Sequence, residues 1–104
     1  PITDMVNELK MRRDLIVKGL QKIKGINCPR PDGAFYVFPD ISQTGIGSQE
    51  FQDRALAEAK VALLSGTSFG ENGEGYVRLS YANSQNNILS AIERLDDFVN
   101  KNMK

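Results

Sequence analysis

Apolar residues in the first quarter of the chain recur with the period of an α-helix. Projected at about 100° per residue, the apolar side chains between positions 3 and 24 fall within one stripe. The residues of this stripe are Met5, Val6, Leu9, Ile16, Val17, Leu20 and Ile23. Gly25 follows Lys22 and Lys24, a combination that often ends a helix because cations stabilise the negative end of its dipole. The pattern predicts one long helix over residues 3–24.

One charged residue, Arg13, projects into the middle of this apolar stripe. A long arginine can bury its aliphatic stem and still keep its guanidinium group in water. The alternative is that the first half of the helix packs on something outside this chain. The sequence leaves both interpretations open.

The rest of the chain shows short strand and helix patterns. The predicted elements are a strand over 26–28, a turn over 29–33, a central strand over 34–38 that is apolar on both faces, a helix over 48–60, strands over 61–64 and 76–81 on either side of a glycine-rich loop, and a last helix. Ser48 and Ser84 are expected to cap the last two helices, since serine is a favourable N-cap residue. Tyr36 and Phe38 are expected in the core, and Cys28 at a strand position as a small hydrophobe.

Each of the two later helices also has an apolar stripe. The side chains expected to face inward are Phe51, Ala55, Leu56 and Ala59 in the first, and Ile88, Ala91, Ile92, Leu95, Phe98 and Val99 in the second. The resulting order is α-β-β-α-β-β-α. Short strand connections through proline and glycine favour a mostly antiparallel or mixed sheet with helices on one face. The predicted fold class is α+β, and 104 residues predict a single domain over 1–104.

Composition removes several classes of function. The chain has no histidine and one cysteine, which excludes intramolecular disulfides, Cys/His zinc sites and Ser-His or Cys-His nucleophile pairs within it. Thirteen basic and thirteen acidic residues cancel, so nothing predicts a nucleic-acid or membrane partner. The longest apolar run covers 34–38, and no secretory leader is visible, so a cytoplasmic location is expected. We expect no metal site.

Arg78 is the residue most suggestive of chemistry. Alternation over 76–81 places Val77, Leu79 and Tyr81 on the face toward the helices. Arg78 then lies at mid-strand on the opposite face. Its planar guanidinium group suits a carboxylate or phosphate ligand, but it equally suits a cross-strand ion pair with a nearby acidic residue. Physical reasoning alone does not decide between the two.

Four segments together resemble a known family. They are RRD at 12–14, PDGAFYVF at 31–38, VALLSGTSFG at 61–70 and GEGYVRLSYA at 73–82. In this order they resemble the R-R-D, P-x-G-A-F-Y, V-x-x-x-P-G-x-x-F-G and G-E-G-x-V-R-L-S-x-A segments of class I aminotransferases of the aspartate aminotransferase fold, which use pyridoxal phosphate (PLP). Ser65 stands where the family usually has proline. The resemblance covers nearly the whole chain and points to the C-terminal small domain.

The resemblance implies a role for each candidate site residue. Arg78 would bind the substrate's α-carboxylate as a bidentate pair, and Thr67, Ser68 and Phe69 would lie near the interdomain cleft. The Schiff-base lysine and the other cofactor-binding groups belong to the large domain, so this chain is expected to hold no catalytic residue and no PLP. It would close the cleft but be inactive alone. The first half of the long helix would contact the large domain, so Met5, Val6 and Leu9 are expected to be exposed, frayed or buried by self-association here.

The parent enzyme implied by the resemblance is a transaminase. It would move an amino group from an amino acid to a 2-oxo acid, with aspartate and 2-oxoglutarate as the default pair, and would be a homodimer. Two alternatives remain: a free-standing α+β interaction or regulatory module, and the small domain of a related PLP lyase or decarboxylase.

Overall fold

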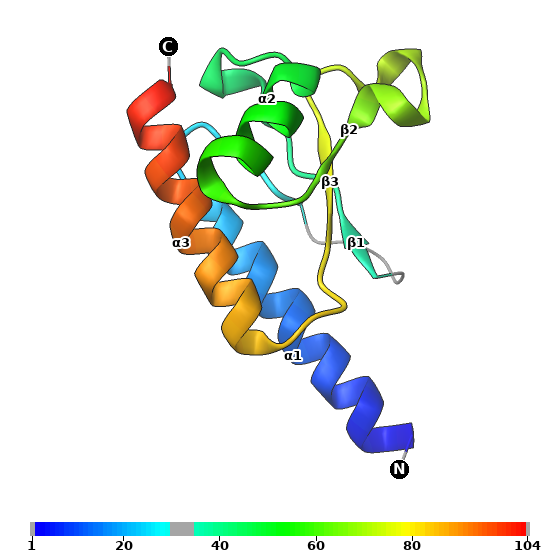
Figure 1. Cartoon of the computed structure of the whole chain (residues 1–104). Helices are drawn as coiled ribbons and strands as arrows, with labels where there is room; N and C mark the ends of the chain where they lie inside the picture. The colour runs from blue at the N-terminus through cyan, green and yellow to red at the C-terminus, as the bar shows by residue number, and fades with distance from the viewer. Residues whose placement is uncertain (1, 30–34, 104) are drawn as a thin grey trace.

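The computed structural model describes residues 2–29 and 35–103, in which helices cover one face of a small antiparallel sheet (Figure 1). The elements are α1 (Ile2–Gln21), β1 (Tyr36–Val37), α2 (Ser48–Arg54), β2 (Leu64–Ser65), β3 (Val77–Ser80) and α3 (Gln85–Asn102), with short helical turns η1 (Ser42–Thr44), η2 (Ala55–Ala59), η3 (Gly66–Phe69) and η4 (Glu71–Gly73). The strand order β1-β3-β2 makes β3 central. The predicted α+β class is confirmed.

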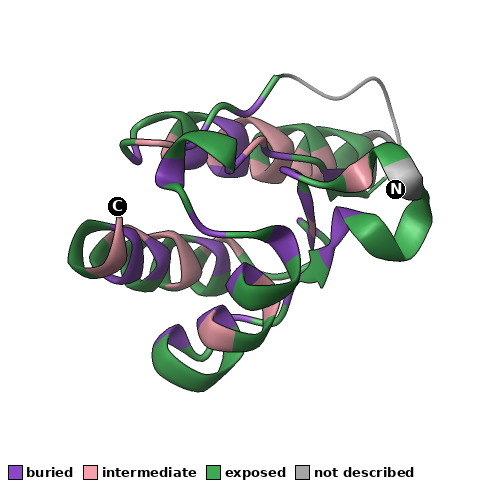
Figure 2. Cartoon of the chain, turned by 90° about the horizontal axis from the view of Figure 1, so that it is seen from above, coloured by how far each residue is buried: buried purple, intermediate pink, exposed green. Residues whose placement is uncertain are grey.

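Helices α1 and α3 pack side by side and run in the same direction (Figure 1). Near their starts, the Gln85 amide donates to Glu8 at 3.1 Å. Further along, Gly19 lets the two helices approach closely, since a Cβ there would stand 2.3 Å from Cδ1 of Ile92. The inward stripes of both helices supply much of the core, which lies between the helices and the sheet (Figure 2).

Three predictions about the shorter elements are wrong. The strand expected over 26–28 is reduced to a bridge in which Asn27 and Asp40 exchange backbone hydrogen bonds of 2.9 and 2.7 Å. Pro29 has no N–H with which to extend it. The strand expected at the centre of the sheet is the edge strand β1, and Tyr36 and Phe38 are exposed rather than buried. Leu56 is also exposed, on the outer side of η2. The predicted turn over 29–33 lies largely outside the described residues.

The lone cysteine is buried as predicted, although it does not stand in a strand. Cys28 is fully buried, and burial raises the pKa of its thiol to about 11. The thiol is therefore protonated at neutral pH, when thiols are poorly nucleophilic.

The start of α2 differs from the prediction. Gly47, not Ser48, is the N-cap residue, and Ser48 is the first residue of the helix. The Ser48 hydroxyl instead bonds to Glu74, which lies 26 positions later in the chain. The cap predicted at Ser84 is confirmed, because its hydroxyl accepts a hydrogen bond from the backbone N–H of Asn87 at 3.1 Å.

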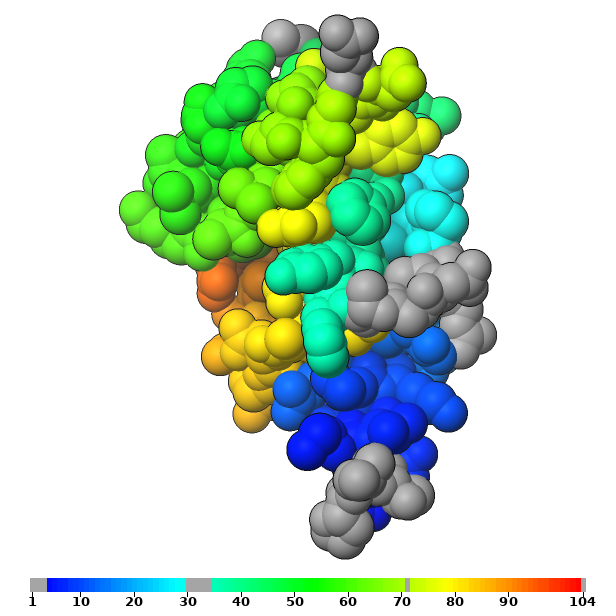
Figure 3. Space-filling view, turned by 90° about the vertical axis from the view of Figure 1, so that its right-hand side faces the viewer, coloured from blue at the N-terminus to red at the C-terminus, as the bar shows by residue number. Residues whose placement is uncertain are grey.

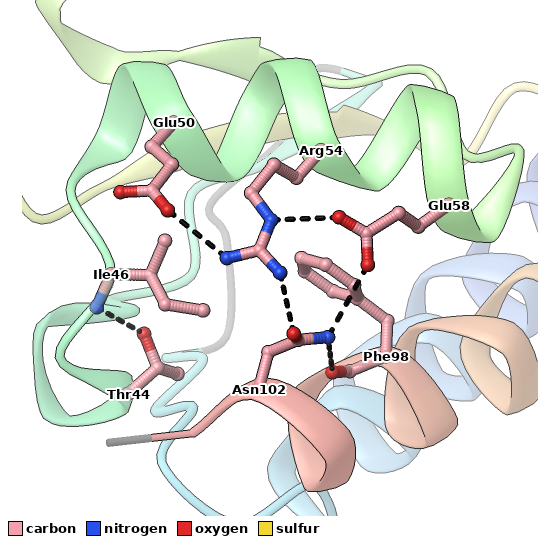
Figure 4. A network of polar contacts seen from close by, with 7 residues as sticks. All are labelled: Thr44, Ile46, Glu50, Arg54, Glu58, Phe98 and Asn102. Carbon is pink, nitrogen blue, oxygen red and sulfur yellow. Dashed lines mark hydrogen bonds and ion pairs between the residues drawn. The ribbon is translucent and has the colours of Figure 1, made fainter.

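A polar network joins α2 and η2 to the end of α3 (Figure 4). The Arg54 guanidinium donates to Glu50 at 3.0 Å, to Glu58 at 2.7 Å and to the Asn102 amide oxygen at 2.5 Å. The hydrogen bond from Arg54 lowers the pKa of Glu58. Below this network the Phe51 and Phe98 rings pack edge to face at 5.4 Å. Polar contacts at the surface and a ring contact in the core thus both hold α2 and η2 against α3.

The first half of α1 extends away from the rest of the molecule (Figure 1). Met5 is 65% exposed and Val6 is 43% exposed, in line with the expectation for this segment, whereas Leu9 is half-buried. Arg13 is mostly buried along its side chain and pairs with the neighbouring Asp14 at 3.4 Å. Within the described ranges, no helix combines the length and apolar character needed to cross a membrane.

Candidate functional site

The face of the sheet away from the helices carries several exposed aromatic rings (Figure 3). Side chains near positions 35–38 gather there beside those near 66–70 and 76–80, although a long stretch of sequence separates the first segment from the other two. The exposed rings at this face are Tyr36, Phe38, Phe69 and Tyr76. Large apolar rings in water cost free energy, so a face of this kind commonly marks an interaction or ligand site.

Arg78 lies in the middle of this aromatic face. As the alternation predicts, Val77 and Leu79 are buried toward the helices, whereas Arg78 is half-buried on the opposite side. Its Cζ atom is 4.2 Å from the centroid of the Tyr36 ring and 4.3 Å from that of Phe69. Both distances are well within the range of cation–π attraction. Two rings therefore flank the guanidinium group.

No carboxylate in the described part of the chain pairs with Arg78, and no described acceptor takes a hydrogen bond from it. The described residues therefore do not form the cross-strand ion pair that the sequence left open. Arginine carries five N–H donors and keeps its charge. The donors of Arg78 are thus available to an anion that approaches from outside the described residues.

Two hollows lie on this face. One, of about 200 Å³, is lined by Arg78, Tyr36, Ser80 and residues 62–64. The other, of about 340 Å³, is lined by the Phe38, Phe69 and Tyr76 rings together with glycines and Asn72. Phe69 belongs to the wall of the second hollow and also contacts Arg78. A ligand bound to Arg78 would therefore have aromatic surface beside it.

Phe69 is positioned by two closely packed turns, η3 and η4. A Cβ added at Gly73 would stand 1.9 Å from the carbonyl oxygen of Gly66, and one added at Gly66 would stand 2.3 Å from the carbonyl oxygen of Gly73. Such distances are far inside van der Waals contact, so both positions require glycine. The close backbone contact fixes the turn that carries Phe69.

Ser65, the departure from the family motif, restrains the same turn. Its hydroxyl accepts a hydrogen bond from Thr67 N–H at 3.2 Å and so caps η3. Its own N–H donates to the Gln52 side chain of α2 at 2.7 Å. A proline has neither group, so the stiffness that proline would give the loop is replaced here by hydrogen bonds.

Glu74 ties the end of the loop to the start of α2. One of its carboxylate oxygens accepts from Ser48 N–H at 2.9 Å, from the Ser48 hydroxyl at 3.0 Å and from Gly75 N–H at 3.0 Å. These hydrogen bonds, that from the Ser48 backbone first, hold the pKa of Glu74 below its ordinary value. Because the bonds favour the charged form, Glu74 stabilises the fold when it is ionised.

Replacing Glu74 with glutamine is expected to lower the melting temperature of the chain at pH 7. A carboxyl group whose pKa is depressed by folding stabilises the folded state above its unfolded pKa, near 4.5, and loses this effect as the pH falls through its folded value. The difference between Glu74→Gln and the original chain should therefore shrink in acid. Thermal melts followed by circular dichroism at several pH values measure this difference in melting temperature. The control is Glu93→Gln, an exposed glutamate of α3; a deficit independent of pH would contradict the role of the charge.

The predicted cleft residues separate into two groups. Phe69 contacts Arg78, whereas Thr67 and Ser68 line neither of the two hollows and have no described contact with it. Tyr36 is a site residue that the sequence analysis missed. The signal was available, because Tyr36 and Val37 alternate, and with Val37 turned to the helices Tyr36 has to share a face with Arg78.

No lysine in the described part of the chain lies beside Arg78, where a PLP Schiff base would need one. All lysines that the structure describes are exposed, and none lines either hollow beside the arginine. The N-terminus of α2, where a phosphate would otherwise find backbone N–H donors, already holds the Glu74 carboxylate.

Comparison with known sequences gives one consistent result. The family model described as "Aminotransferase class I and II" matches residues 2–95. The aspartate aminotransferase of Pyrococcus horikoshii is 44% identical over 95 residues, covering 91% of this chain and 24% of the relative. The aromatic-amino-acid aminotransferase 2 of Thermococcus litoralis is 41% identical over 95 residues, which again cover 91% of this chain and 24% of the relative. The chain therefore spans about a quarter of the length of these relatives.

Solved structures agree with this result. A crystal structure of an aromatic aminotransferase from Pyrococcus horikoshii superposes with a TM-score of 0.91 at 40% identity, over 96% of this chain and 26% of that one. The aspartate aminotransferase from Rhizobium meliloti gives a TM-score of 0.87 at 30% identity, over 94% and 26% of the two chains. The resemblance noted in the sequence motifs is confirmed.

Proposed function

Because the chain belongs to the class I and II aminotransferases, we propose that it is the C-terminal small domain of a PLP-dependent aminotransferase and supplies the substrate-binding arginine. Arg78 would bind the α-carboxylate of the substrate. The observation that carries this proposal is the state of its guanidinium group, which is flanked by two rings and unpaired among the described residues. A planar carboxylate matches the guanidinium fork with two parallel hydrogen bonds.

The substrates would be an amino acid and a 2-oxo acid. Both carry a carboxylate beside the reacting carbon, so one arginine serves both halves of an amino-group transfer. The relatives are named for different amino acids, aspartate and aromatic ones among them. We propose aspartate and 2-oxoglutarate as the substrate pair, on the similarity to the aspartate aminotransferases.

The remainder of the parent protein would contribute the rest of the site. PLP, held by the large domain of the parent, would supply the electron sink for the amino-group chemistry. The small domain would orient the substrate through its carboxylate and help exclude water when the cleft closes. The parent would be a cytoplasmic homodimer, and the exposed Met5 and Val6 of α1 would contact its large domain.

The 104-residue chain mixed with PLP and dialysed is expected to retain no cofactor absorption and to transaminate no amino acid. The described lysines are exposed, and none lines the two hollows beside Arg78 and Phe69. Absorption spectra after dialysis and a coupled transamination assay measure this, with the full-length enzyme treated in parallel as the control. A persistent absorption band that disappears when one lysine is substituted would contradict the proposal.

A further inference from the structure

We infer that Phe69 and Tyr36 are positioning residues, whose rings hold the Arg78 guanidinium group in place while leaving its N–H donors free for the carboxylate. The inference rests on the proposed function of Arg78 and adds to it the means by which the arginine is preorganised. It concerns the two rings, neither of which would itself touch the carboxylate.

The two rings come from different neighbours of β3. Tyr36 lies on β1, where it pairs with Ser80, two residues along β3 from Arg78. Phe69 lies at the end of η3, directly after β2, whose Leu64 pairs with Arg78. Each centroid is within 4.3 Å of Cζ. The guanidinium group is thus restrained from both flanks of its strand.

Aromatic rings restrain an arginine without using its donors. An ion pair with a carboxylate of the chain would also fix the side chain, but it would occupy the fork that a substrate needs. A ring attracts the cation through its π-face, and the N–H groups remain available. An arginine restrained before binding also loses less side-chain entropy when the ligand arrives. The absence of a described acidic partner at Arg78 fits this arrangement.

Phe69 is itself held firmly. The Phe38 ring meets it edge to face, with centroids 6.4 Å apart and planes at 86°. The contact between Gly66 and Gly73 fixes the backbone of its turn. The Phe38 ring and the packing of the two turns therefore determine where the Phe69 ring lies relative to Arg78.

Nuclear magnetic resonance of the 104-residue chain tests the contact directly. Protons above an aromatic face are shifted upfield, so the Nε–H and Cδ protons of Arg78 should resonate upfield of those of the other arginines. Phe69→Leu and Tyr36→Leu should each reduce this shift. The matched control is Phe35→Leu, since Phe35 is 49% exposed against 51% for Phe69 and has no ring contact with Arg78. An ordinary Arg78 shift, unchanged in both variants, would overturn the inference.

Kinetics of the full-length enzyme test the consequence. Phe69→Leu and Tyr36→Leu should raise KM for both the amino acid and the 2-oxo acid by about 5- to 30-fold, the equivalent of one lost cation–π contact. The kcat should change by less than about threefold, because the reacting groups are untouched. Phe69→Tyr keeps a ring and should restore KM, and Phe35→Leu is again the control.

The outcomes separate this inference from the proposed function. If Arg78→Ala abolishes most activity while both leucine variants keep KM within about twofold of the original, the inference is wrong and the carboxylate role stands. If Arg78→Ala itself has little effect, the proposed function is wrong and the inference falls with it. A rise in KM that Phe69→Tyr does not reverse would also overturn the inference, because it would show loss of packing rather than loss of a ring.

Discussion

Arg78→Ala in the full-length enzyme is expected to lower kcat/KM by about 30- to 4000-fold. The reason is that a substrate carboxylate in a desolvated cleft would lose its charge-assisted hydrogen bonds, a loss on the order of 2–5 kcal/mol in transition-state binding. Arg78→Lys should also have a low kcat/KM, because an ammonium group cannot form the two parallel hydrogen bonds of the guanidinium fork. Steady-state kinetics with an amino acid and a 2-oxo acid measure both variants.

Cofactor binding provides the internal control for these variants. Since Arg78 is assigned to the substrate, the cofactor's visible absorption should be unchanged in both. Arg94→Ala is the matched surface control, because Arg94 lies on α3 in the helical layer and donates to the Ala59 carbonyl oxygen. If kcat/KM falls by less than about threefold in Arg78→Ala, the arginine has only a structural role.

Gly73→Ala is expected to destabilise the chain by about 1–3 kcal/mol, as overpacking of a closely packed region does. The added Cβ would stand 1.9 Å from the Gly66 carbonyl oxygen, and no change of rotamer can move a Cβ away from a backbone atom. Turns η3 and η4 would have to separate, and Phe69 would move with them. In the full-length enzyme the same substitution should raise KM.

Urea unfolding of the 104-residue chain measures the change in free energy of unfolding. Gly47→Ala is the comparison variant, because an added Cβ there would meet nothing closer than Glu74 Oε2 at 4.0 Å and the residue has an ordinary φ of −65°. It loses only the preference for glycine over alanine at an N-cap, so the loss in Gly73→Ala should be the larger. If Gly73→Ala and Gly47→Ala unfold at the same urea concentration as the original chain, the packing of the two turns is looser than described.

The sequence predicted the parts of the fold that depend on local periodicity. Residues 77–81 alternate clearly, and the structure buries Val77 and Leu79 as expected. The helix after Ser84 begins and packs as its cap and apolar stripe predict. The segment over 34–38 was misread because an unbroken apolar run is typical of a central strand. Here the Tyr36 and Phe38 rings lie exposed on the open face of an edge strand instead.

The candidate site was predictable in part. Arg78 could be assigned to the open face from alternation alone, and its carboxylate role rests on the family motif. The aromatic pair around it could not be assigned, because Tyr36 and Phe69 are 33 positions apart and meet only through sheet pairing and the packing of two turns. The role of Glu74 at the start of α2 was missed for the same reason, since no local pattern joins it to Ser48.

A crystal structure of the full-length enzyme with an unreactive amino-acid analogue tests the central claim most directly. The proposal predicts that the α-carboxylate of the analogue lies about 2.7–2.9 Å from two nitrogens of Arg78, the ordinary distance for a charged N–H···O bond. It also predicts that the Tyr36 and Phe69 rings remain beside the guanidinium group. A carboxylate bound elsewhere, with Arg78 paired to an acidic residue of the parent, would contradict the claim.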